Sequence, residues 1–207
     1  MIAAANLDEM FGQIDIYLFD QLLRGRIPRE SRILDAGCGH GRNVSYLLDA
    51  GYDVSAIDAD PSAVAEVRRL AADLNASLLP TNFRREPVED LTFPDASMDV
   101  VLSIAVLHFA LSDEQFEAML LAMWRVLKPG GLLFCRLASN IGMETRMVPR
   151  RGRRSLLPDG SERYLVDEAL LLDWTRRLGG VLLDPLKTTI VQDQRCMTTW
   201  VVRKGVP

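Results

Sequence analysis

The feature that most constrains this chain is a glycine-rich turn that directly follows a short apolar run. Residues 33–41 read Ile-Leu-Asp-Ala-Gly-Cys-Gly-His-Gly, and apolar residues then return at helical spacing between Val44 and Leu48. Glycines such as Gly37 and Gly39 tolerate positive φ, and without a Cβ they let a ligand lie against the backbone. The segment therefore predicts a strand, a tight turn and a helix, with room for a nucleoside at the turn.

Short apolar runs alternate with segments of helical period from Ser31 to Phe134. This alternation is typical of a parallel sheet wrapped by helices, and 207 residues suffice for one such α/β domain but not for two. Strands are predicted at residues 32–36, 54–57, 98–104, 132–135, 181–183 and 197–202. Helices are predicted at residues 7–23, 44–50, 61–71, 112–128 and 167–178. Asp60, Ser112 and Asp167 stand at the starts of the last three helices. The run Pro129, Gly130 and Gly131 is expected to end the fourth helix.

Composition excludes several classes of protein. The net charge of -4 gives no general electrostatic reason to expect nucleic acid as a partner. Three cysteines without CxxC spacing argue against a disulfide framework and against a zinc site, so no metal is expected. Neither a membrane-spanning run nor a secretory signal is recognisable, which favours a cytoplasmic location.

An acidic residue follows the glycine turn at the spacing expected of a ribose-binding carboxylate. Asp58 ends the second predicted strand about twenty residues on, where a carboxylate can accept hydrogen bonds from both hydroxyls of a ribose. In one alternative, the glycines only form a tight turn and Asp58 is a solvated strand end. In another, the chain is a dinucleotide-binding oxidoreductase, but that fingerprint needs glycine where Arg42 stands and has no use for Asp35. The ammonium group of a methionine moiety does use such a carboxylate, directly or through water.

Residues 34–41 resemble the first motif of the class I methyltransferases, which bind S-adenosylmethionine. Further matches to that family are Glu-Asp-Leu at 89–91, Phe-Pro-Asp at 93–95, Asp-Val-Val-Leu-Ser at 99–103, Val-Leu-His at 106–108 and Trp-Arg-Val-Leu-Lys-Pro-Gly-Gly at 124–131. The resemblance covers roughly residues 31–137. It implies a single-domain Rossmann-like fold whose seven-stranded, mostly parallel sheet has an antiparallel last strand and helices on both faces. It also implies an enzyme that transfers a methyl group and leaves S-adenosylhomocysteine.

The resemblance also implies the residues that hold the cofactor. Asp58 would hold the ribose, the Gly37 to Gly41 backbone would border the methionine part, and Ala59 would pack beside the adenine. The family's acidic residue for the adenine amino group is replaced here by Pro87, so Glu86 or Glu89, or backbone and water, would take its place. The full predicted cofactor set is Asp35, Gly37, Cys38, Gly39, Arg42, Asp58, Ala59, Val88, Glu89 and Ser103.

A finer resemblance concerns two short stretches. Gly-Arg-Asn at 41–43, followed by Gly-Tyr-Asp-Val at 51–54, resembles the small tellurite-resistance and thiopurine-type methyltransferases. It covers about fifteen residues and does not identify the methyl acceptor, because acceptors are bound by loops grafted on the fold.

Methyl transfer by in-line displacement needs chiefly a nucleophile held on the correct axis, and a base only if the acceptor must lose a proton. His108, after the strand at 98–104, is the candidate base; alternatively it is a packed, hydrogen-bonded loop residue. Cys38 neighbours the cofactor by position, where a small side chain suffices. His40 more plausibly shapes the glycine turn than takes part in the chemistry.

Acceptor binding is predicted at Tyr17, Phe109 and Arg146. Tyr17 or Phe11 would cover the bound sulfonium from an N-terminal helix, unless that helix only packs on the sheet. Arg146 belongs to an arginine-rich segment, residues 145–161, that is either a solvated mobile loop or a lid for an anionic acceptor. No aromatic residue interleaves its arginines, which disfavours nucleic acid.

The chain is thus predicted to be one methyltransferase domain, residues 1–207, acting as a monomer or homodimer on a small molecule, which is an anion if the arginine-rich segment is its lid. Its expected parts are an N-terminal helical segment (1–30), a cofactor-binding core (31–137), a basic loop or lid (138–165) and a C-terminal helix with strands (166–207). A non-catalytic sensor that binds the same cofactor remains the alternative function.

Overall fold

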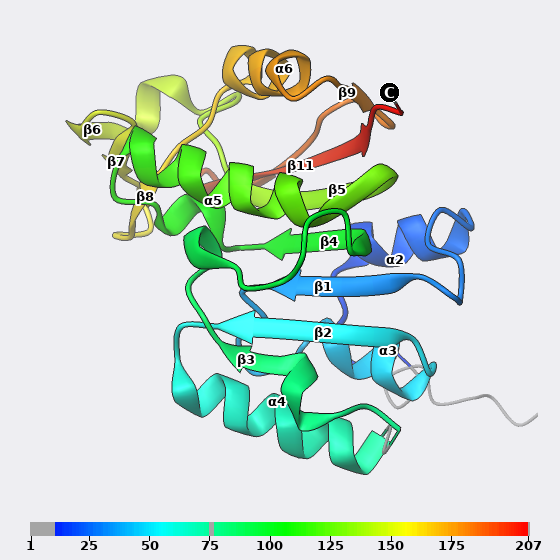
Figure 1. Ribbon diagram of the computed structural model, residues 1–207. Coiled ribbons are helices and arrows are strands. Elements are labelled where there is room, and N and C mark those ends of the chain that lie inside the picture. The colour runs from blue at the N-terminus through cyan, green and yellow to red at the C-terminus, as the bar shows by residue number, and fades with distance from the viewer. Residues whose placement is uncertain (1–10, 75–76, 207) are drawn as a thin grey trace, which may run out of the picture.

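An eight-stranded sheet runs through the centre of the molecule, and helices cover both of its faces (Figure 1). The computed structural model describes residues 11–74 and 77–206. Strand order is β10-β11-β5-β4-β1-β2-β3, with β9 also paired to β11. The strands are β1 Arg32–Ala36, β2 Asp53–Asp58, β3 Phe83–Arg85, β4 Met98–Ile104, β5 Leu127–Ala138, β9 Gly180–Leu182, β10 Lys187–Val191 and β11 Arg195–Lys204.

The central strands are parallel and β11 is antiparallel, as the resemblance implied. Ile33 of β1 pairs with Val54 of β2, whereas β11 runs against β5. β9 and β10 pair with successive parts of β11, on the edge away from β5, so they act as one interrupted edge strand. Because the parallel strands all end on one side of the sheet, the residues that follow them gather at that carboxyl edge.

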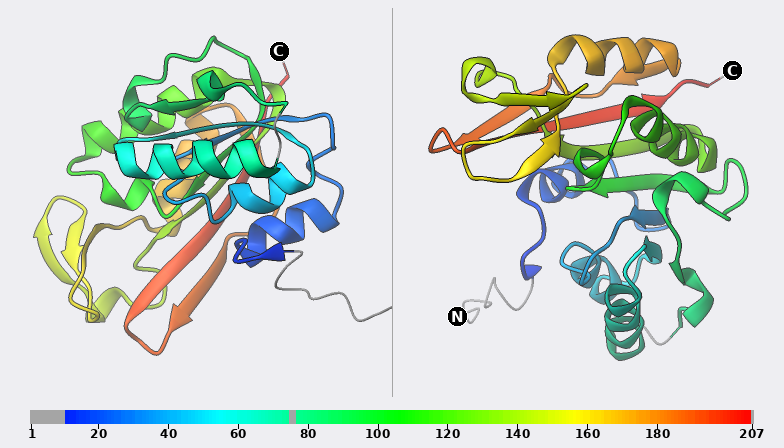
Figure 2. Two further views of the ribbon diagram at one scale, coloured as in Figure 1. Left: turned by 90° about the horizontal axis from the view of Figure 1, so that it is seen from below. Right: turned by 90° about the vertical axis from the view of Figure 1, so that its left-hand side faces the viewer.

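The helices divide between the two faces (Figure 2). On one face α2, α3 and α4 pack against side chains such as Ile33 and Val54, and on the other α5 and α6 pack against Val101 and Trp200. The helices are α2 Ile16–Leu23, α3 Val44–Asp49, α4 Pro61–Leu74, α5 Asp113–Val126 and α6 Glu168–Arg177. Short 3-10 turns are η1 Pro80–Asn82, η2 Val88–Asp90, η3 Leu107–Phe109 and η4 Glu144–Arg146.

Helix starts follow the predicted caps. Asp60 accepts from the Ser62 amide at 2.8 Å, and Asp167 accepts from the Leu170 amide at 2.7 Å. At α5 the Ser112 hydroxyl accepts from the Gln115 amide at 3.3 Å, while Gln115 Oε1 accepts from Leu111 N rather than from Ser112 N. Side-chain oxygens thus satisfy amides that the first turn of each helix leaves unpaired.

The fourth helix ends earlier than predicted. α5 ends at Val126, and β5 begins at once because Leu127 pairs with Met98. The Pro-Gly-Gly run therefore lies inside β5, at a register shift, and does not end the helix. A Cβ on Gly131 would stand 2.9 Å from Asp99 O, so the irregularity requires glycine there.

Other departures lie at the edges. The sequence did not predict β3 or β10, which are short edge strands. The predicted helix at 7–23 is confirmed only as α2, which Asp15 caps through the Tyr17 amide; residues 7–10 lie outside the described residues.

The segment expected to be a basic loop, residues 138–165, contains a second sheet. β6 Val148–Arg151, β7 Arg154–Leu156 and β8 Glu162–Tyr164 pair antiparallel beside the carboxyl edge (Figure 1). Local pairing between neighbouring strands, with a glycine of positive φ in each turn, explains why this charged stretch is ordered.

Cys38, Cys135 and Cys196 are free and buried. Within residues 11–74 and 77–206, no helix is both long enough and apolar enough to cross a membrane.

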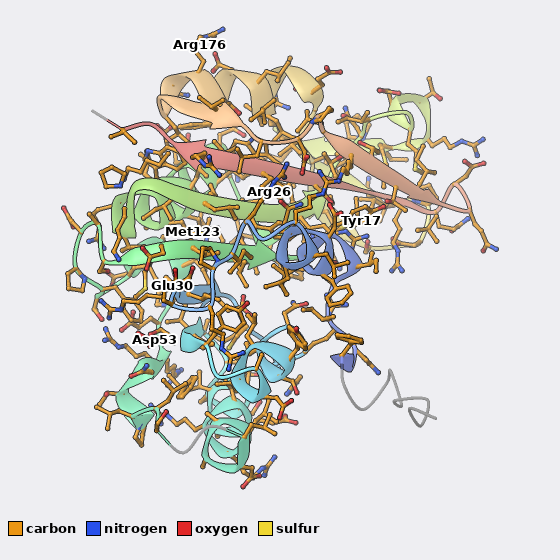
Figure 3. All side chains as sticks on the ribbon, turned by 90° about the vertical axis from the view of Figure 1, so that its right-hand side faces the viewer. Tyr17, Arg26, Glu30, Asp53, Met123 and Arg176 are labelled. Carbon is orange, nitrogen blue, oxygen red and sulfur yellow. The ribbon has the colours of Figure 1, made fainter. Side chains whose placement is uncertain are left out.

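A buried carboxylate ties α2 to the C-terminal strands, and Figure 3 labels Arg26 and Tyr17 in this region. Asp184, between β9 and β10, accepts from Arg26 at 2.7 Å and from Gln21 at 3.2 Å. Burial acts to raise the pKa of Asp184, but the hydrogen bonds from Arg26 and Gln21 outweigh it, so the pKa lies below its ordinary value.

We expect Asp184→Asn to lower the free energy of unfolding by about 1.5–3 kcal/mol near pH 7, the usual worth of hydrogen bonds to a charged group. Because the folded-state pKa of Asp184 is depressed, this contribution is present above pH 4 and is lost as pH falls through the folded-state pKa. Urea unfolding at several pH values measures it. Asp53→Asn is the control, since the Asp53 pair with Arg32 is about half exposed and such pairs contribute about 0–1 kcal/mol. Equal losses in both variants would contradict the expectation.

Candidate functional site

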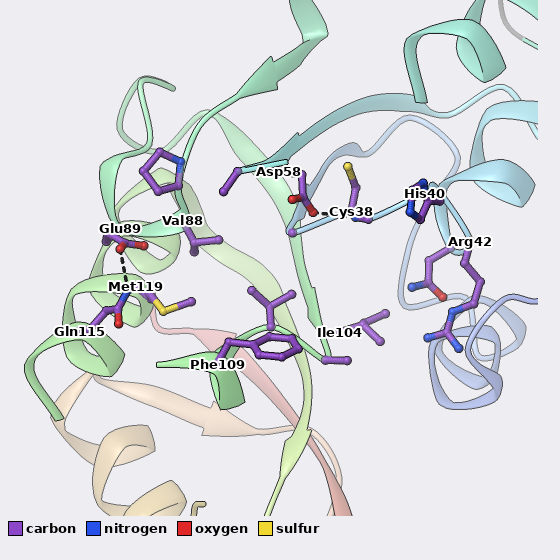
Figure 4. Close-up of a pocket in the computed structure, with 17 residues that line it drawn as sticks. Cys38, His40, Arg42, Asp58, Val88, Glu89, Ile104, Phe109, Gln115 and Met119 are labelled. Atoms are coloured by element: carbon purple, nitrogen blue, oxygen red, sulfur yellow. Dashed lines mark hydrogen bonds between the residues drawn. The ribbon is translucent and has the colours of Figure 1, made fainter. Parts of the chain in front are cut away.

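A cavity of about 560 Å³ opens at the carboxyl edge of the sheet, between the ends of β1, β2 and β4 (Figure 4). Its wall includes most of the predicted cofactor set. The predicted residues on the wall are Gly37, Cys38, Gly39, Arg42, Asp58, Ala59, Val88 and Glu89.

The glycine turn forms one side of this cavity. Gly37 N and Cys38 N both donate to the Ile57 carbonyl of β2, each at 2.9 Å. Gly37 has a φ of +96°, and a Cβ there would lie 2.4 Å from a methyl group of Val106. Gly39 also has a positive φ, +50°, but a Cβ there would meet no atom within 4 Å. Gly37 is therefore required for packing, whereas Gly39 leaves space for a ligand.

Asp58 stands at the end of β2 with its carboxylate held by the backbone. Oδ2 accepts from Gly39 N at 2.8 Å and Oδ1 accepts from Asp60 N at 2.9 Å. Each carboxylate oxygen has lone pairs for a further donor. The two amides thus orient Asp58 and leave it able to accept both hydroxyls of a ribose.

Asp35 lies at the end of β1, 1% exposed, and neither of its carboxylate oxygens has a hydrogen-bond partner. Burial, together with the charge of Asp58, raises the pKa of Asp35 to about 7, although Arg42 acts in the opposite direction. A buried carboxylate without a partner is costly, and a ligand cation would remove that cost. Asp35 therefore fits the ammonium group of a methionine moiety.

The other end of the cavity is lined by Ala59, Pro87, Val88 and Glu89. Of the two acids that could substitute for the one missing at Pro87, Glu89 lies on the wall and accepts from Gln115 Nε2 at 2.8 Å. Glu86 instead accepts from the Thr92 amide at 3.1 Å, and it is not on the cavity wall. Of these two acids, only Glu89 is on the cavity wall.

Several wall residues were not predicted from the sequence, namely Asn43, Ile104, Ala105, Val106, Gln115 and Met119. Ile104 to Val106 follow β4 at the carboxyl edge, a position that could have suggested them. Gln115 and Met119 lie one turn apart on α5, and the sequence indicated only a helix cap and a core position there.

Asp35, Ser103 and His108 do not lie on this wall. Ser103 is fully buried on β4, and its hydroxyl has no hydrogen-bond partner. His108 Nδ1 accepts from the Ala138 amide at 3.2 Å, and burial, with the charge of Arg163, lowers the pKa of His108 to about 4. A ring with its lone pair engaged and so low a pKa is a poor base at neutral pH. The geometry therefore supports the packed, hydrogen-bonded alternative for His108.

Cys38 is on the wall but is not activated. Burial, with the charges of Asp35 and Asp58, raises the pKa of the Cys38 thiol far above its ordinary value. Only the thiolate is a strong nucleophile. The structure thus agrees with a small packing residue at this position.

The predicted acceptor residues are separated. Phe109, 54% exposed, lines the cavity, but Tyr17 lies outside it and hydrogen-bonds Thr189 at 2.7 Å. Arg146 pairs with Asp193 at 3.1 Å and also lies outside the wall. Phe11 packs against Phe19 and Tyr46, where it does not cover the cavity.

Two further arginines of the 145–161 segment form ion pairs within it or nearby. Arg153 contacts Asp167 at 2.8 Å, and Arg154 contacts Glu162 at 2.7 Å. Within the described part of the chain, no group of three or more histidine, cysteine or acidic residues is arranged to hold a metal ion.

Comparison with known proteins agrees with this geometry. Residues 34–135 match the family described as a methyltransferase domain. This segment is thus similar to methyltransferase domains. The buried unpartnered carboxylate of Asp35, the oriented Asp58 and the open face of Gly39 fit S-adenosylmethionine, which we identify as the cofactor of this domain.

Relatives of the methyltransferase domain differ in what their names say they act on. A probable S-adenosylmethionine-dependent methyltransferase of Mycolicibacterium smegmatis is 31% identical over 121 residues, which are 56% of this chain and 43% of that protein. The eEF1A lysine and N-terminal methyltransferase of Bos taurus is 34% identical over 116 residues, 52% of this chain and 16% of that protein. The chain therefore spans less than half the length of these curated relatives.

A solved structure shares the fold over most of the chain. The Burkholderia thailandensis 1,6-didemethyltoxoflavin-N1-methyltransferase, with bound 1,6-didemethyltoxoflavin and S-adenosylhomocysteine, has a TM-score of 0.69 and 20% identity. The likeness covers 97% of this chain and 82% of that one.

Replacing Asp35 by Asn should have opposite effects on stability and on cofactor binding. Because the folded-state pKa of Asp35 is raised, folding retains a proton that the unfolded chain loses above about pH 4, so the parent loses stability as pH rises from 4 to 7. At pH 8 we expect Asp35→Asn to be more stable than the parent by up to about 4 kcal/mol, which is the free energy that corresponds to a pKa of about 7 instead of the ordinary 3.8. Near pH 4 the variant and the parent should be equally stable.

Cofactor affinity should move the other way, since the amide cannot pair with an ammonium group. Urea unfolding and calorimetric titration of S-adenosylhomocysteine at pH 4 to 8 measure both quantities. A variant that gains no stability at pH 8 would contradict the burial of a carboxylate, and one that keeps full affinity would contradict its role.

Replacing Gly39 by Val should abolish cofactor binding at a modest cost in stability. Valine at positive φ costs about 1–3 kcal/mol. Gly152→Val is the matched control, because Gly152 has a φ of +56°, also has no atom within 4 Å of a built Cβ, and lies outside the cavity. Thermal unfolding should show similar losses in both variants, whereas calorimetry should show lost binding in Gly39→Val alone. Retained binding in Gly39→Val would mean that the glycine serves only the turn.

Proposed function

We propose that this protein is an enzyme that transfers a methyl group from S-adenosylmethionine to a small-molecule acceptor. The observation that carries the proposal is a pair of acids at the ends of neighbouring strands: Asp35 is buried and unpartnered two residues before Gly37 of the cavity wall, and the oriented carboxylate of Asp58 is on that wall. A sulfonium nucleoside with an amino-acid tail needs both groups. A dinucleotide needs only the second, because its pyrophosphate is repelled by an acid at the position of Asp35.

Different residues of the site bind different parts of the cofactor. Asp58 accepts the ribose hydroxyls, Asp35 pairs with the ammonium group, and Arg42 is placed to meet the carboxylate of the methionine part. Ala59, Val88 and Glu89 bound the adenine. This arrangement holds the reacting end of the cofactor toward Ala105 and Phe109, on the side where β4 ends.

The chemistry of the bound cofactor is a methyl carbon attached to positively charged sulfur, whose bonding pair leaves with sulfur as the acceptor forms its new bond. The protein must then mainly position the acceptor. His108 is not the base in this proposal, because its pKa of about 4 makes it a weak base and its Nδ1 lone pair is engaged. An acceptor that already carries a lone pair or negative charge on the reacting atom suits such a site.

The proposed small acceptor would approach the reacting end beside Phe109, a half-exposed residue of the cavity wall. The resemblance to the tellurite-resistance and thiopurine-type branch stays part of this proposal, since the Gly-Arg-Asn stretch at 41–43 places Arg42 and Asn43 on the cavity wall. Relatives named for protein lysine make a protein acceptor the competing possibility, and an acceptor screen must include both classes.

Calorimetric titration of S-adenosylmethionine and S-adenosylhomocysteine, followed by an acceptor screen for S-adenosylhomocysteine release, tests the proposal. Asp58→Ala should weaken both titrations at least tenfold, because each hydrogen bond to a charged group is worth about 1.5–3 kcal/mol. Asp60→Ala is the control, since Asp60 caps α4 outside the cavity. Unchanged affinity in folded Asp58→Ala would contradict the ribose role. Tight binding without turnover on any small or protein acceptor would favour a sensor.

A further inference from the structure

A second cavity, of about 350 Å³, adjoins the first at the carboxyl edge. We call it the arginine pocket, because Arg42, Arg136, Arg163 and Arg195 all line it, with Asp159 as its one carboxylate. The four arginines come from the turn before α3, from β5, from β8 and from β11, so the tertiary fold assembles them.

Arg136 is the deepest of these arginines. Its Nη1 donates to Asp15 at 2.9 Å, and its guanidinium lies over the Tyr17 ring at 5.3 Å. Its Nε is buried and has no hydrogen-bond partner. The Asp15 carboxylate and the Tyr17 ring thus fix the guanidinium while leaving donors for a ligand. Tyr17 acts here as a positioning residue, which differs from the sulfonium cover expected from the sequence.

Arg163 and Arg195 bring charge to the outer wall. Arg163 lies over the Phe109 ring at 4.8 Å and donates to the Glu162 carbonyl at 2.8 Å, contacts that leave its charge without a carboxylate partner in direct contact. Arg195 is exposed on β11. Burial acts to raise the pKa of Asp159, but hydrogen bonds from Ser161 and, after them, the charges of Arg163 and Arg195 lower it. The arginines of the pocket outnumber the two carboxylates near them, Asp15 and Asp159, so the pocket has a net positive charge.

His108 adds a neutral donor to the same wall. Its Nδ1 accepts from the Ala138 amide, so the hydrogen of the neutral ring is on Nε2. The remaining wall is largely apolar, from Leu157, Val191 and Met197. A ligand of this pocket therefore combines an anionic group with an apolar body.

The two cavities share Arg42, Ala105 and Phe109. Phe109, labelled among the wall residues in Figure 4, lines both cavities. A molecule whose anionic group lies in the arginine pocket can therefore extend past Phe109 toward the reacting end of the first cavity.

We propose that the arginine pocket is the acceptor site and that the methyl acceptor is a small anion, with a carboxylate or phosphate ester bound by Arg136, Arg163 and Arg195. This inference rests on the proposed function, whose acceptor it narrows to a chemical class. It differs from the lid expected of residues 145–161, because Arg146, Arg153 and Arg154 are engaged in ion pairs of their own. Guanidinium groups hold either anion by paired hydrogen bonds.

The test uses the full chain saturated with S-adenosylhomocysteine at about 0.01 M salt, where charges act over about 30 Å. Calorimetry or ligand-observed NMR compares matched anionic and neutral probes: benzoate with benzamide, phenylacetate with phenylacetamide, hexanoate with hexanamide, and phenyl phosphate with phenol. We expect at least one anion to bind tenfold or more tightly than its neutral partner. The carboxylate and phosphate arms identify which anion the site takes.

Arg163→Gln with Arg195→Gln should remove that preference, and Arg195→Gln alone, at an exposed position, should reduce it without loss of thermal stability. Arg150→Gln is the control, because Arg150 is an exposed arginine of β6 outside both cavities. Absence of preference for every anion, or a preference that survives the double substitution, would overturn the proposal. Failure to bind S-adenosylhomocysteine at all would instead overturn the proposed function.

Discussion

One carbonyl oxygen organises the cofactor site. The Ile57 carbonyl accepts hydrogen bonds from both Gly37 N and Cys38 N, and these bonds hold the turn after β1 against Val106. The crowding against Val106 excludes any side chain at Gly37. Once the turn is held this way, Gly39 N reaches the Asp58 carboxylate, and the orientation of the ribose acid follows from the turn.

Burial determines the protonation of the two most informative side chains. Asp35 and His108 both lie where water does not reach, so each is displaced toward its neutral form, Asp35 by a raised pKa and His108 by a lowered one. The consequences differ because of hydrogen bonding. His108 Nδ1 accepts a hydrogen bond from the Ala138 amide, which holds the ring in place. The carboxylate oxygens of Asp35 have no hydrogen-bond partner, so a bound cation would stabilise them. A binding site that lowers the stability of the free protein is a common feature of function.

Arginines that are neighbours in the sequence indicated the anion site less well than arginines that the fold brings together. Arg153 and Arg154, in the turn after β6 and at the start of β7, pair with the nearby acids Asp167 and Glu162. Arg136 and Arg195 are far apart in sequence, yet both lie on the wall of the arginine pocket because β5 and β11 are neighbours. Their side chains point to a common space, which leaves donors for a ligand.

The sequence by itself determined the parallel core, the glycine turn, the helix caps and the cofactor wall from Gly37 to Glu89, because each depends on residues close along the chain or on periodic burial. It also determined which acid ends β2. Tertiary structure decided that Leu127 begins β5, since the pairing with Met98 competes with one more helical turn. It likewise decided the small sheet at 148–164, the short edge strands β3 and β10, the removal of Ser103 and Arg146 from the cavity wall and the gathering of Arg136, Arg163 and Arg195. The small sheet forms by local pairing that its charged sequence did not indicate. The other outcomes depend on long-range pairing and on side-chain direction, which no local pattern of residues encodes.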